Sequence, residues 1–386
     1  MQRSGILPGQ RLIVILYRHD YSCLAYLSGH QAAFRAIVRS QMKRLLCEEI
    51  KENESVMQAI SVRNDGQNPS DLFLNETQKP KPAPGHVLIR TAFAGVNRPD
   101  ILQRKGNYPP PQGASPILGL EVSGVIEIIN PLVNYGDDVG WKVGDEICAL
   151  VNGGGYAEYV SVDIRHLLPV PRGLSLAQAG SLPENILTVY ANLMEHGALQ
   201  AGETVLVHGG NSGIGAMTIQ MGKAFGARVI ATARGADKCA FAKSMGADMV
   251  IDTETEEFVA AVKAFGGADV VLDIVAGDFF AKNLACLNMR GRIVQVGFGK
   301  EAVVEVDLRR IMAKLAIVTG SMLRPRSPDE KARITAKVHE RVWPLIESGA
   351  IRPILAAEFD FTDAAGAHAW MDAGDHKGKV VLRVSS

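Results

Sequence analysis

The chain has 386 residues, 47% of them hydrophobic and 21% charged, and its formal net charge at pH 7 is zero. These values are typical of a soluble globular enzyme with two to three domains, and the zero net charge argues against nucleic acid or an anionic membrane as a partner. No apolar run is long enough to span a bilayer. The five cysteines include no C-x-x-C pair, which argues against a disulfide framework or a cysteine-rich zinc site and predicts a reducing, cytoplasmic location.

Residues 1–56 differ in composition from the rest of the chain. They are rich in arginine, and Asp20 is the only acidic residue before Glu48. An organelle transit peptide has this composition, but we favour an unstructured or wrongly assigned extension. Met57 opens a strand-like segment, so we expect the functional protein to begin near that residue.

Residues 57–181 contain short strand-like segments that glycines and prolines separate. This spacing predicts a compact, mostly antiparallel β barrel. The predicted strands cover residues 87–90, 92–96, 122–129, 146–151 and 156–162.

The stretch from Thr204 to Ala216 combines a short apolar run, a cluster of glycines and the start of a helix, and a second strand-like run follows at residues 228–233. Such a unit places a pyrophosphate on the helix N-terminus, and glycine lets the backbone approach the phosphate oxygens. The sequence therefore predicts a dinucleotide site at the turn, formed by Gly210, Asn211, Ser212, Gly213, Ile214 and Gly215.

Four more strand-like runs follow, at residues 249–252, 269–275, 292–296 and 315–319, with helical segments between them. Six parallel strands with crossover helices make a doubly wound Rossmann domain, which we place at residues 182–319. We expect residues 320–386 to return to the β domain, where the run at 380–384 can close its sheet. The predicted fold class is therefore α/β, with the Rossmann domain inserted before the C-terminal return.

The glycine spacing Gly209-x-x-x-Gly213-x-Gly215 also matches the short-chain dehydrogenases. Those enzymes need a Tyr-x-x-x-Lys pair after the motif, and this chain has no tyrosine after Gly215. A β domain also precedes the motif here. We therefore reject the short-chain interpretation.

Several stretches across residues 57–386 make the chain resemble the medium-chain dehydrogenases/reductases, and among them the zinc-free, zeta-crystallin-like quinone oxidoreductases. They are residues 94–100, 106–110, 118–124, 182–185, 208–215, 319–324 and 378–381. The resemblance implies a GroES-like catalytic domain at residues 57–181 and 320–386, NADPH as hydride donor, and a homodimer or homotetramer formed through the Rossmann domain.

Zinc-bearing relatives carry a cysteine where this chain has Asn97, a Gly-His-Glu motif where it has Gly119-Leu120-Glu121, and a four-cysteine lobe. Leucine offers no ligand atom to zinc, which binds Cys, His or carboxylate. We therefore predict no stoichiometric zinc. A quinone that accepts hydride becomes a delocalised hydroquinone anion, so it needs orientation and a proton donor more than a metal.

The candidate catalytic residues are Tyr108 and Asn97. Tyr108 either donates a hydrogen bond to the quinone oxygen or packs against the proline loop that follows it. Asn97 matches a family residue near the nicotinamide ribose and the substrate, where an amide can donate and accept. The resemblance adds cofactor contacts at Thr188, Phe298, Gly299, Arg324 and Lys379. Arg324 and Lys379 are alternatively solvated surface charges.

Cofactor preference depends on the residues after the second Rossmann strand. NAD-specific domains carry an acidic residue there, whereas this chain has Arg234 and, one turn later, Lys238. We therefore expect NADPH to be preferred over NADH, unless both cations are merely solvated at the helix start. Asp252 stands in the Ile-Asp-Thr sequence that replaces the family's Ile-Asn-Tyr, and its charge can oppose a 2′-phosphate.

The predicted function is an NADPH-dependent quinone reductase with a small-molecule substrate and neither nucleic acid nor membrane as a partner. One alternative is a reductase of enones or 2-alkenals, because both substrate classes accept hydride into a conjugated carbonyl. The other is a cofactor-binding, crystallin-like protein with little turnover.

Overall fold

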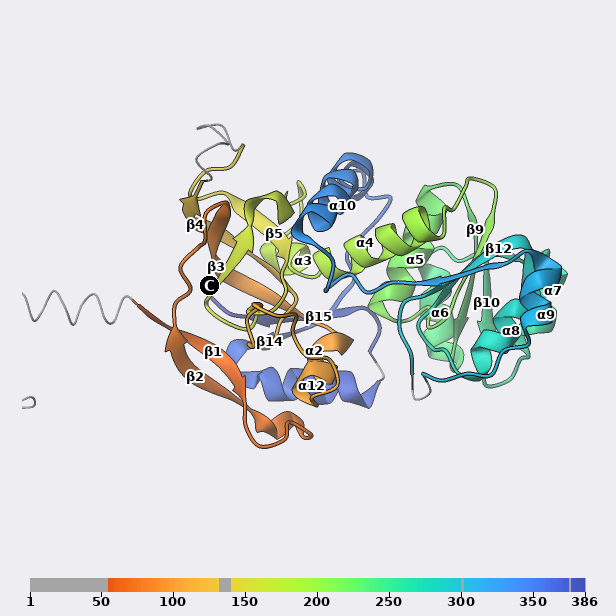
Figure 1. Ribbon diagram of the computed structural model, residues 1–386, viewed down its shortest axis with the longest axis horizontal. Coiled ribbons are helices and arrows are strands. Elements are labelled where there is room, and N and C mark those ends of the chain that lie inside the picture. The colour runs from red at the N-terminus through yellow and green to blue at the C-terminus, as the bar shows by residue number, and fades with distance from the viewer. Residues whose placement is uncertain (1–54, 132–139, 300–301, 375, 386) are drawn as a thin grey trace, which may run out of the picture. The chain divides into compact units, whose positions relative to one another are not determined.

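The computed structural model describes residues 55–131, 140–299, 302–374 and 376–385 (Figure 1). Met57–Ser386 forms one compact unit, distinct from Met1–Val56. The predicted extension therefore lies almost entirely outside the described residues. Among the described helices, none is both long enough and apolar enough for a bilayer crossing.

A seven-stranded sheet forms the first lobe of this unit, with the strand order β14-β15-β3-β4-β5-β7 and β6 paired to β3. All of its pairs are antiparallel except β14 with β15. β15 pairs with β3, which confirms that the end of the chain joins the first sheet. The strands are β3 (His86–Val96), β4 (Glu121–Asn130), β5 (Glu146–Leu150), β6 (Tyr159–Asp163), β7 (Leu167–Pro169), β14 (Leu355–Asp360) and β15 (Lys379–Arg383).

Smaller elements complete this β lobe. β1 (Val56–Val62) and β2 (Leu72–Gln78) form a separate two-stranded sheet. Helix α2 (Arg98–Arg104) follows β3, and the side chain of Asp100 in its first turn accepts from the backbone amide of Asn97 at 2.8 Å. Helix α12 (Ala364–Ala373) connects β14 to β15 along the chain, and it contacts both strands.

A six-stranded parallel sheet forms the second lobe, with the order β10-β9-β8-β11-β12-β13. This is the doubly wound order, in which the direction of winding reverses between β8 and β11. β8 is buried along its whole length because helices cover both faces. The strands are β8 (Thr204–Val207), β9 (Arg228–Ala233), β10 (Met249–Asp252), β11 (Ala268–Asp273), β12 (Leu287–Gln295) and β13 (Ile317–Gly320).

The helices of this second lobe lie near the predicted positions. They are α5 (Gly213–Ala224), α6 (Ala236–Ser244), α7 (Phe258–Phe265), α8 (Asp278–Cys286) and α9 (Leu308–Lys314). Helix α7 begins only at Phe258, because residues 253–255 form a turn whose amides bond back to Ala233 and Asp252.

Helices α3 (Leu176–Ala179), α4 (Pro183–Tyr190) and α10 (Pro328–Arg341) lie between the two sheets (Figure 1). A π-helix, Ala191–His196, continues α4, and α11 (Trp343–Glu347) follows α10. One apolar core runs through these helices into both lobes. It includes Leu168 of β7, Ile186 of α4, Val207 of β8 and Ile334 of α10.

Candidate active site

The glycine turn after β8 brings the backbone into close contacts that exclude side chains. A Cβ on Gly215 would lie 2.1 Å from the carbonyl oxygen of Gly209, and one on Gly213 would lie 2.5 Å from Asn185 Nδ2. Ser212 caps α5, because its hydroxyl accepts from the Gly215 amide at 2.9 Å. The glycines therefore let the chain turn tightly into α5, and the N-terminal amides of that helix suit an anionic pyrophosphate.

The turn is also tied to the C-terminal return of the chain. Asn211 Nδ2 donates to the backbone carbonyl of His376 at 3.2 Å, and the backbone amide of Gly378 donates to the backbone carbonyl of Asn211 at 3.2 Å. The glycine turn and the start of β15 thus form one connected surface between the two lobes.

At the end of β9, basic and acidic side chains lie close together. Arg234 is exposed, and Lys238 Nζ donates to the carbonyl of Gly374 at 3.0 Å. Asp252 accepts from the amides of Gly235 and Glu254 at 2.9 and 3.0 Å. These amide bonds lower the pKa of Asp252, so its carboxylate stays charged at the Gly235 amide, one residue after Arg234.

Asn97, Glu121 and Lys379 form a buried polar cluster where β3 ends and where β4 and β15 begin. Lys379 Nζ lies 2.5 Å from Glu121 Oε1 and also donates to Asn97 Oδ1. Asn97 Nδ2 donates to the same Glu121 oxygen at 2.9 Å, and Glu121 Oε2 accepts from the Glu184 amide at 2.9 Å. Glu121 is fully buried, so the ammonium of Lys379 balances its charge.

Arg324 packs against Tyr108. Its guanidinium carbon lies 5.3 Å from the centroid of the Tyr108 ring. Arg324 Nη2 donates to Gln103 Oε1 and to the Asn152 carbonyl, both at 2.7 Å. Burial, and then the charge of Glu184, raise the pKa of Tyr108, so its hydroxyl stays protonated at neutral pH and can donate a hydrogen bond.

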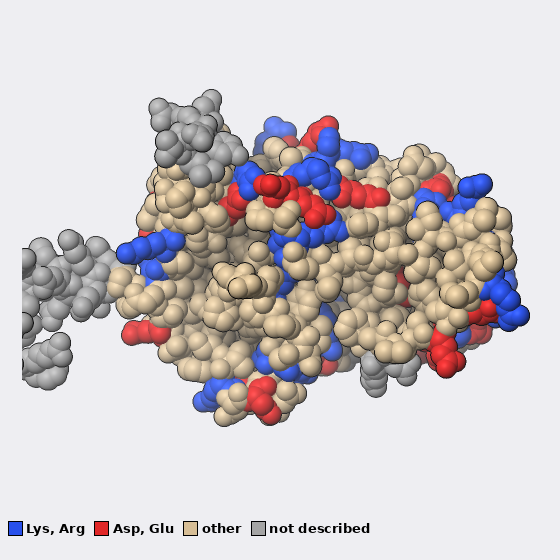
Figure 2. Space-filling view, in the orientation of Figure 1, with Lys and Arg blue, Asp and Glu red and all other residues tan. Residues whose placement is uncertain are grey.

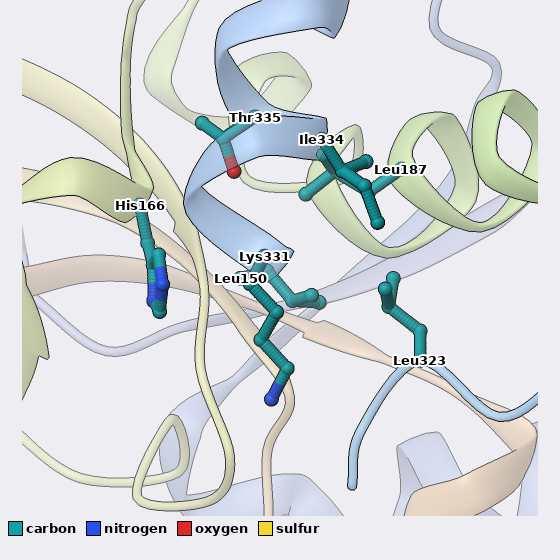
Figure 3. Close-up of a pocket in the computed structure, with 7 residues that line it drawn as sticks. All are labelled: Leu150, His166, Leu187, Leu323, Lys331, Ile334 and Thr335. Atoms are coloured by element: carbon teal, nitrogen blue, oxygen red, sulfur yellow. The ribbon is translucent and has the colours of Figure 1, made fainter. Parts of the chain in front are cut away.

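Lys331 of α10 supports Arg324 from the other side. Lys331 Nζ donates to Asn152 Oδ1 at 2.5 Å and to the Arg324 carbonyl at 2.6 Å. Burial lowers the pKa of this lysine to about 8. Figure 3 shows its side chain in a pocket with Leu150, Leu187 and Leu323.

The other predicted nicotinamide contacts lie on α4 and after β12. Thr188 is on α4, and its hydroxyl is 3.5 Å from Glu184 Oε1. Phe298 is 59% exposed. The amide of Gly299 donates to the carbonyl of Val275 at 2.8 Å, which joins the loops after β11 and β12 at the carboxyl edge of the sheet.

Comparison with known proteins places these two lobes in a family. Residues 83–172 match the alcohol dehydrogenase GroES-like domain, and residues 213–338 match the zinc-binding dehydrogenase domain. A probable oxidoreductase from Mycobacterium abscessus is 31% identical, with a TM-score of 0.71 over 85% of this chain and 99% of its own. The chain belongs to the medium-chain dehydrogenase/reductase family. Within that family it is homologous to the quinone oxidoreductases.

Two relatives of this medium-chain dehydrogenase/reductase carry the word quinone in their names. Mouse quinone oxidoreductase is 29% identical, over 85% of this chain and 98% of the mouse protein. Escherichia coli quinone oxidoreductase, solved in complex with NADPH, is 26% identical, with a TM-score of 0.74 over 85% of this chain and 100% of its own.

Other relatives are far longer than this chain. Phthioceranic/hydroxyphthioceranic acid synthase of Mycobacterium tuberculosis (strain H37Rv) is 27% identical over 90% of this chain, but the match covers only 16% of the synthase.

A nicotinamide dinucleotide fits the glycine turn of this medium-chain dehydrogenase/reductase. Gly213 and Gly215 allow a tight turn that packs against Asn185 and the Gly209 carbonyl, and this turn leads directly into the N-terminus of α5, a helix of 12 residues whose first amides suit a pyrophosphate. When bound, a reduced nicotinamide supplies a hydride, which carries two electrons. Gly210, Asn211, Ser212 and Ile214 line the same turn.

The structure brings two pairs of predicted site residues together: Asn97 with Lys379, and Tyr108 with Arg324. Lys379 directs its ammonium into the β lobe, while its stem faces the glycine turn, where a Cβ on Gly213 would lie 2.9 Å from Lys379 Cδ. Among the described residues, no group of three or more His, Cys, Asp or Glu side chains could hold a metal ion. The absence of zinc in the purified protein stays a prediction for elemental analysis.

Sequence reasoning missed four charged residues of this site. Glu121 and Glu184 lie within stretches that carried the family resemblance, and for Glu121 its position between the apolar residues Leu120 and Val122 was a usable signal. Asp100 also lies in such a stretch, but its role as a helix cap can be recognised only when the first residue of α2 is known. Lys331 is surrounded by other charged residues on α10, so nothing in its sequence context marks it as buried.

Proposed function

We propose that the protein is an NADPH-dependent quinone reductase that transfers hydride between its two lobes without a metal. The observation that carries this proposal is the Asn97–Glu121–Lys379 cluster, in which a paired ammonium bonds to Asn97, the residue that stands where zinc-bearing relatives carry a cysteine. A paired ammonium has no open coordination position with which to stabilise an alkoxide, as alcohol oxidation requires. A conjugated carbonyl acceptor needs no such stabilisation.

The residues opposite the glycine turn support the same proposal. The Tyr108 hydroxyl can donate to the acceptor oxygen, and the guanidinium of Arg324 lies behind the tyrosine ring. The acceptor oxygen gains negative charge as the hydride arrives, and a nearby donor and cation stabilise that charge. Similarity to the mouse and Escherichia coli quinone oxidoreductases supports a quinone as the acceptor.

A panel of quinones and enones, each assayed with NADPH and with NADH, tests the proposal. We expect NADPH oxidation with quinones at a kcat/KM well above that with any enone. The reverse order would replace the proposal with an enone or 2-alkenal reductase. Intact NADPH binding with no turnover of any acceptor would instead support a crystallin-like, cofactor-binding protein.

A further inference from the structure

Glu184 is the partly exposed member of a group of charged side chains that are otherwise buried. It lies in the first turn of α4, and its backbone amide bonds to Glu121. Five charged side chains come close enough to shift its pKa or to be shifted by it: Asp100 of α2, Glu121 of β4, Lys379 of β15, Arg324, and Lys331 of α10.

The three cations of this group are already engaged elsewhere. Lys379 bonds to Glu121 and Asn97, Arg324 to Asn152 and Gln103, and Lys331 to Asn152 and the Arg324 carbonyl. Among the described residues, no cation forms an ion pair with Glu184. Its carboxyl therefore lacks the partner that would hold it ionised.

The electrostatic surroundings agree with this geometry. Burial, and then the negative charge of Glu121, raise the pKa of Glu184 to about 7. A large fraction of Glu184 is therefore a neutral carboxylic acid at physiological pH. The Glu184 carboxyl also lies on the side of α4 that carries Thr188, a predicted nicotinamide contact, whose hydroxyl is 3.5 Å from Glu184 Oε1.

Asp100 is the competing acid, since burial also raises its pKa to about 7. Its two oxygens accept from the amides of Asn97 and Gly119 at 2.8 and 3.0 Å, and its side chain is fully buried. Asp100 thus fixes the turn before α2, and no ligand can reach it.

We propose that Glu184 is the acid that protonates the reduced acceptor. This inference rests on the proposed function. The hydride and its two electrons convert the acceptor into an anion with its charge on oxygen. The O–H bond of the Glu184 carboxyl breaks, and the proton forms a new O–H bond with the anion. Glu184 is left as a carboxylate, which takes a proton from water before the next turnover.

The test compares Glu184→Gln with the wild type over pH 5 to 9, using the best quinone from the panel. For the wild type we expect kcat/KM to fall above about pH 7, as the acid ionises. The variant should be slower by on the order of 10²-fold and should show no such fall. Glu184→Asp keeps an acid and should recover part of the rate.

A second readout does not depend on turnover. Infrared difference spectra of wild type minus Glu184→Gln should show a protonated carboxyl that disappears near pH 7, while Asp100 contributes equally to both proteins and cancels. The control is Glu146→Gln, at an exposed position that starts β5, which should leave both rate and spectrum unchanged. Nicotinamide binding should be the same in all variants.

An active wild type with an equally active Glu184→Gln, or a spectrum without the protonated carboxyl at pH 6, overturns this inference alone. A wild type that reduces neither quinones nor enones overturns the proposed function as well, so the two failures are distinguishable.

Discussion

Tyr108 has its ring fixed by Arg324 and keeps a protonated hydroxyl at neutral pH. We expect Tyr108→Phe to lower kcat/KM for quinones by about tenfold or more, because a hydrogen bond to a charged group contributes about 1.5–3 kcal/mol. The KM for NADPH should stay near the wild-type value. Tyr159→Phe, on β6 and against Lys79, is the control. Unchanged turnover in Tyr108→Phe would reduce Tyr108 to a packing residue.

The Glu121 carboxylate is fully buried, and the ammonium of Lys379 balances its negative charge. Replacing it with Met leaves that carboxylate without its cation, which costs about 3–5 kcal/mol for a buried pair. We expect urea unfolding of Lys379→Met to show a loss of this size. The double variant Lys379→Met/Glu121→Gln should be more stable than the single one. If the single variant loses less than 1 kcal/mol, the pair behaves as an exposed one and the buried cluster has no energetic role.

We expect Arg234 and Lys238 to favour NADPH over NADH, in competition with the charge of Asp252. Two cations contribute up to about 1.5–3 kcal/mol each to binding a 2′-phosphate, and less after solvent screening. The acidic side chain of Asp252, bonded to the Gly235 amide, opposes them. We expect Arg234→Ala/Lys238→Ala to raise the KM for NADPH about tenfold and to leave the KM for NADH nearly unchanged.

Asp252→Asn is the complementary variant, and it should lower the KM for NADPH by removing the opposing charge. Equal use of both cofactors by the wild type, or an equal loss for both in the double variant, would contradict the assignment of these cations to the phosphate.

At the scale of elements, a buried chain of hydrogen bonds joins the residue after β8 to β9, α8 and β11. His208 Nδ1 lies 2.9 Å from Thr232 Oγ1, and His208 Nε2 lies 2.7 Å from Asn283 Oδ1. Asn283 Nδ2 donates to Asp273 Oδ2 at 3.0 Å. The other oxygen of Asp273 accepts the amides of Val275 and Ala276, which hold the loop after β11.

Asn283→Leu should disrupt this chain, because it leaves a buried histidine N–H and a carboxylate oxygen without partners. Each unsatisfied buried group costs about 1–3 kcal/mol. We expect a loss of stability of that order and a higher KM for the cofactor, since the loop after β11 loses its anchor. The control is Asn288→Leu, which removes a hydrogen bond to Asp269 at the opposite end of β11. This variant should also lose stability, but its KM for the cofactor should stay at the wild-type value. A normal cofactor KM in Asn283→Leu would show that the loop is held by other contacts.

Most elements could be predicted because local patterns specify them. Each strand of the parallel sheet is a short apolar run, and the glycine turn cannot accept side chains at Gly213 and Gly215. Boundaries were less predictable. β12 begins at Leu287, whereas the predicted strand begins at residue 292, because its early residues include polar and positive-φ positions such as Arg290 that look like a turn.

The site could be predicted only where one segment carries it. Lys379 and Glu121 are 258 residues apart and meet because β15 and β4 both pair with β3. No local pattern encodes that contact. The roles of Glu184 and Lys331 depend on burial and on which cations are already engaged, and these properties exist only in the folded protein.

At the scale of the whole molecule, charge does not mark a docking surface on the face shown in Figure 2. Basic and acidic side chains are interspersed there, with uncharged surface between them. Exposed apolar side chains instead concentrate near the end of the parallel sheet. They are Leu308 and Met312 of α9, Leu315 directly after that helix, Ile317 and Val318 of β13, and Met322.

β13 is an edge strand, and in the described part of the chain it pairs only with β12. An edge strand with apolar neighbours presents unpaired backbone groups to another strand. We propose that a second copy of this chain covers it. A two-fold axis perpendicular to the sheet would pair the two β13 strands antiparallel, and each copy would use the same surface. This deepens the expectation of an oligomer formed through the Rossmann domain.

Light scattering after size-exclusion chromatography tests this pairing. We expect the wild type to have the mass of a dimer or of a tetramer built from dimers, and Met312→Lys/Ile317→Lys to have the mass of a monomer, because four lysines would face one another across the axis. Ile128→Lys, an exposed apolar position on β4 in the other lobe, should keep the wild-type mass. A monomeric wild type, or an equal loss of assembly in the Ile128→Lys control, would mean that the β13 edge is not the interface.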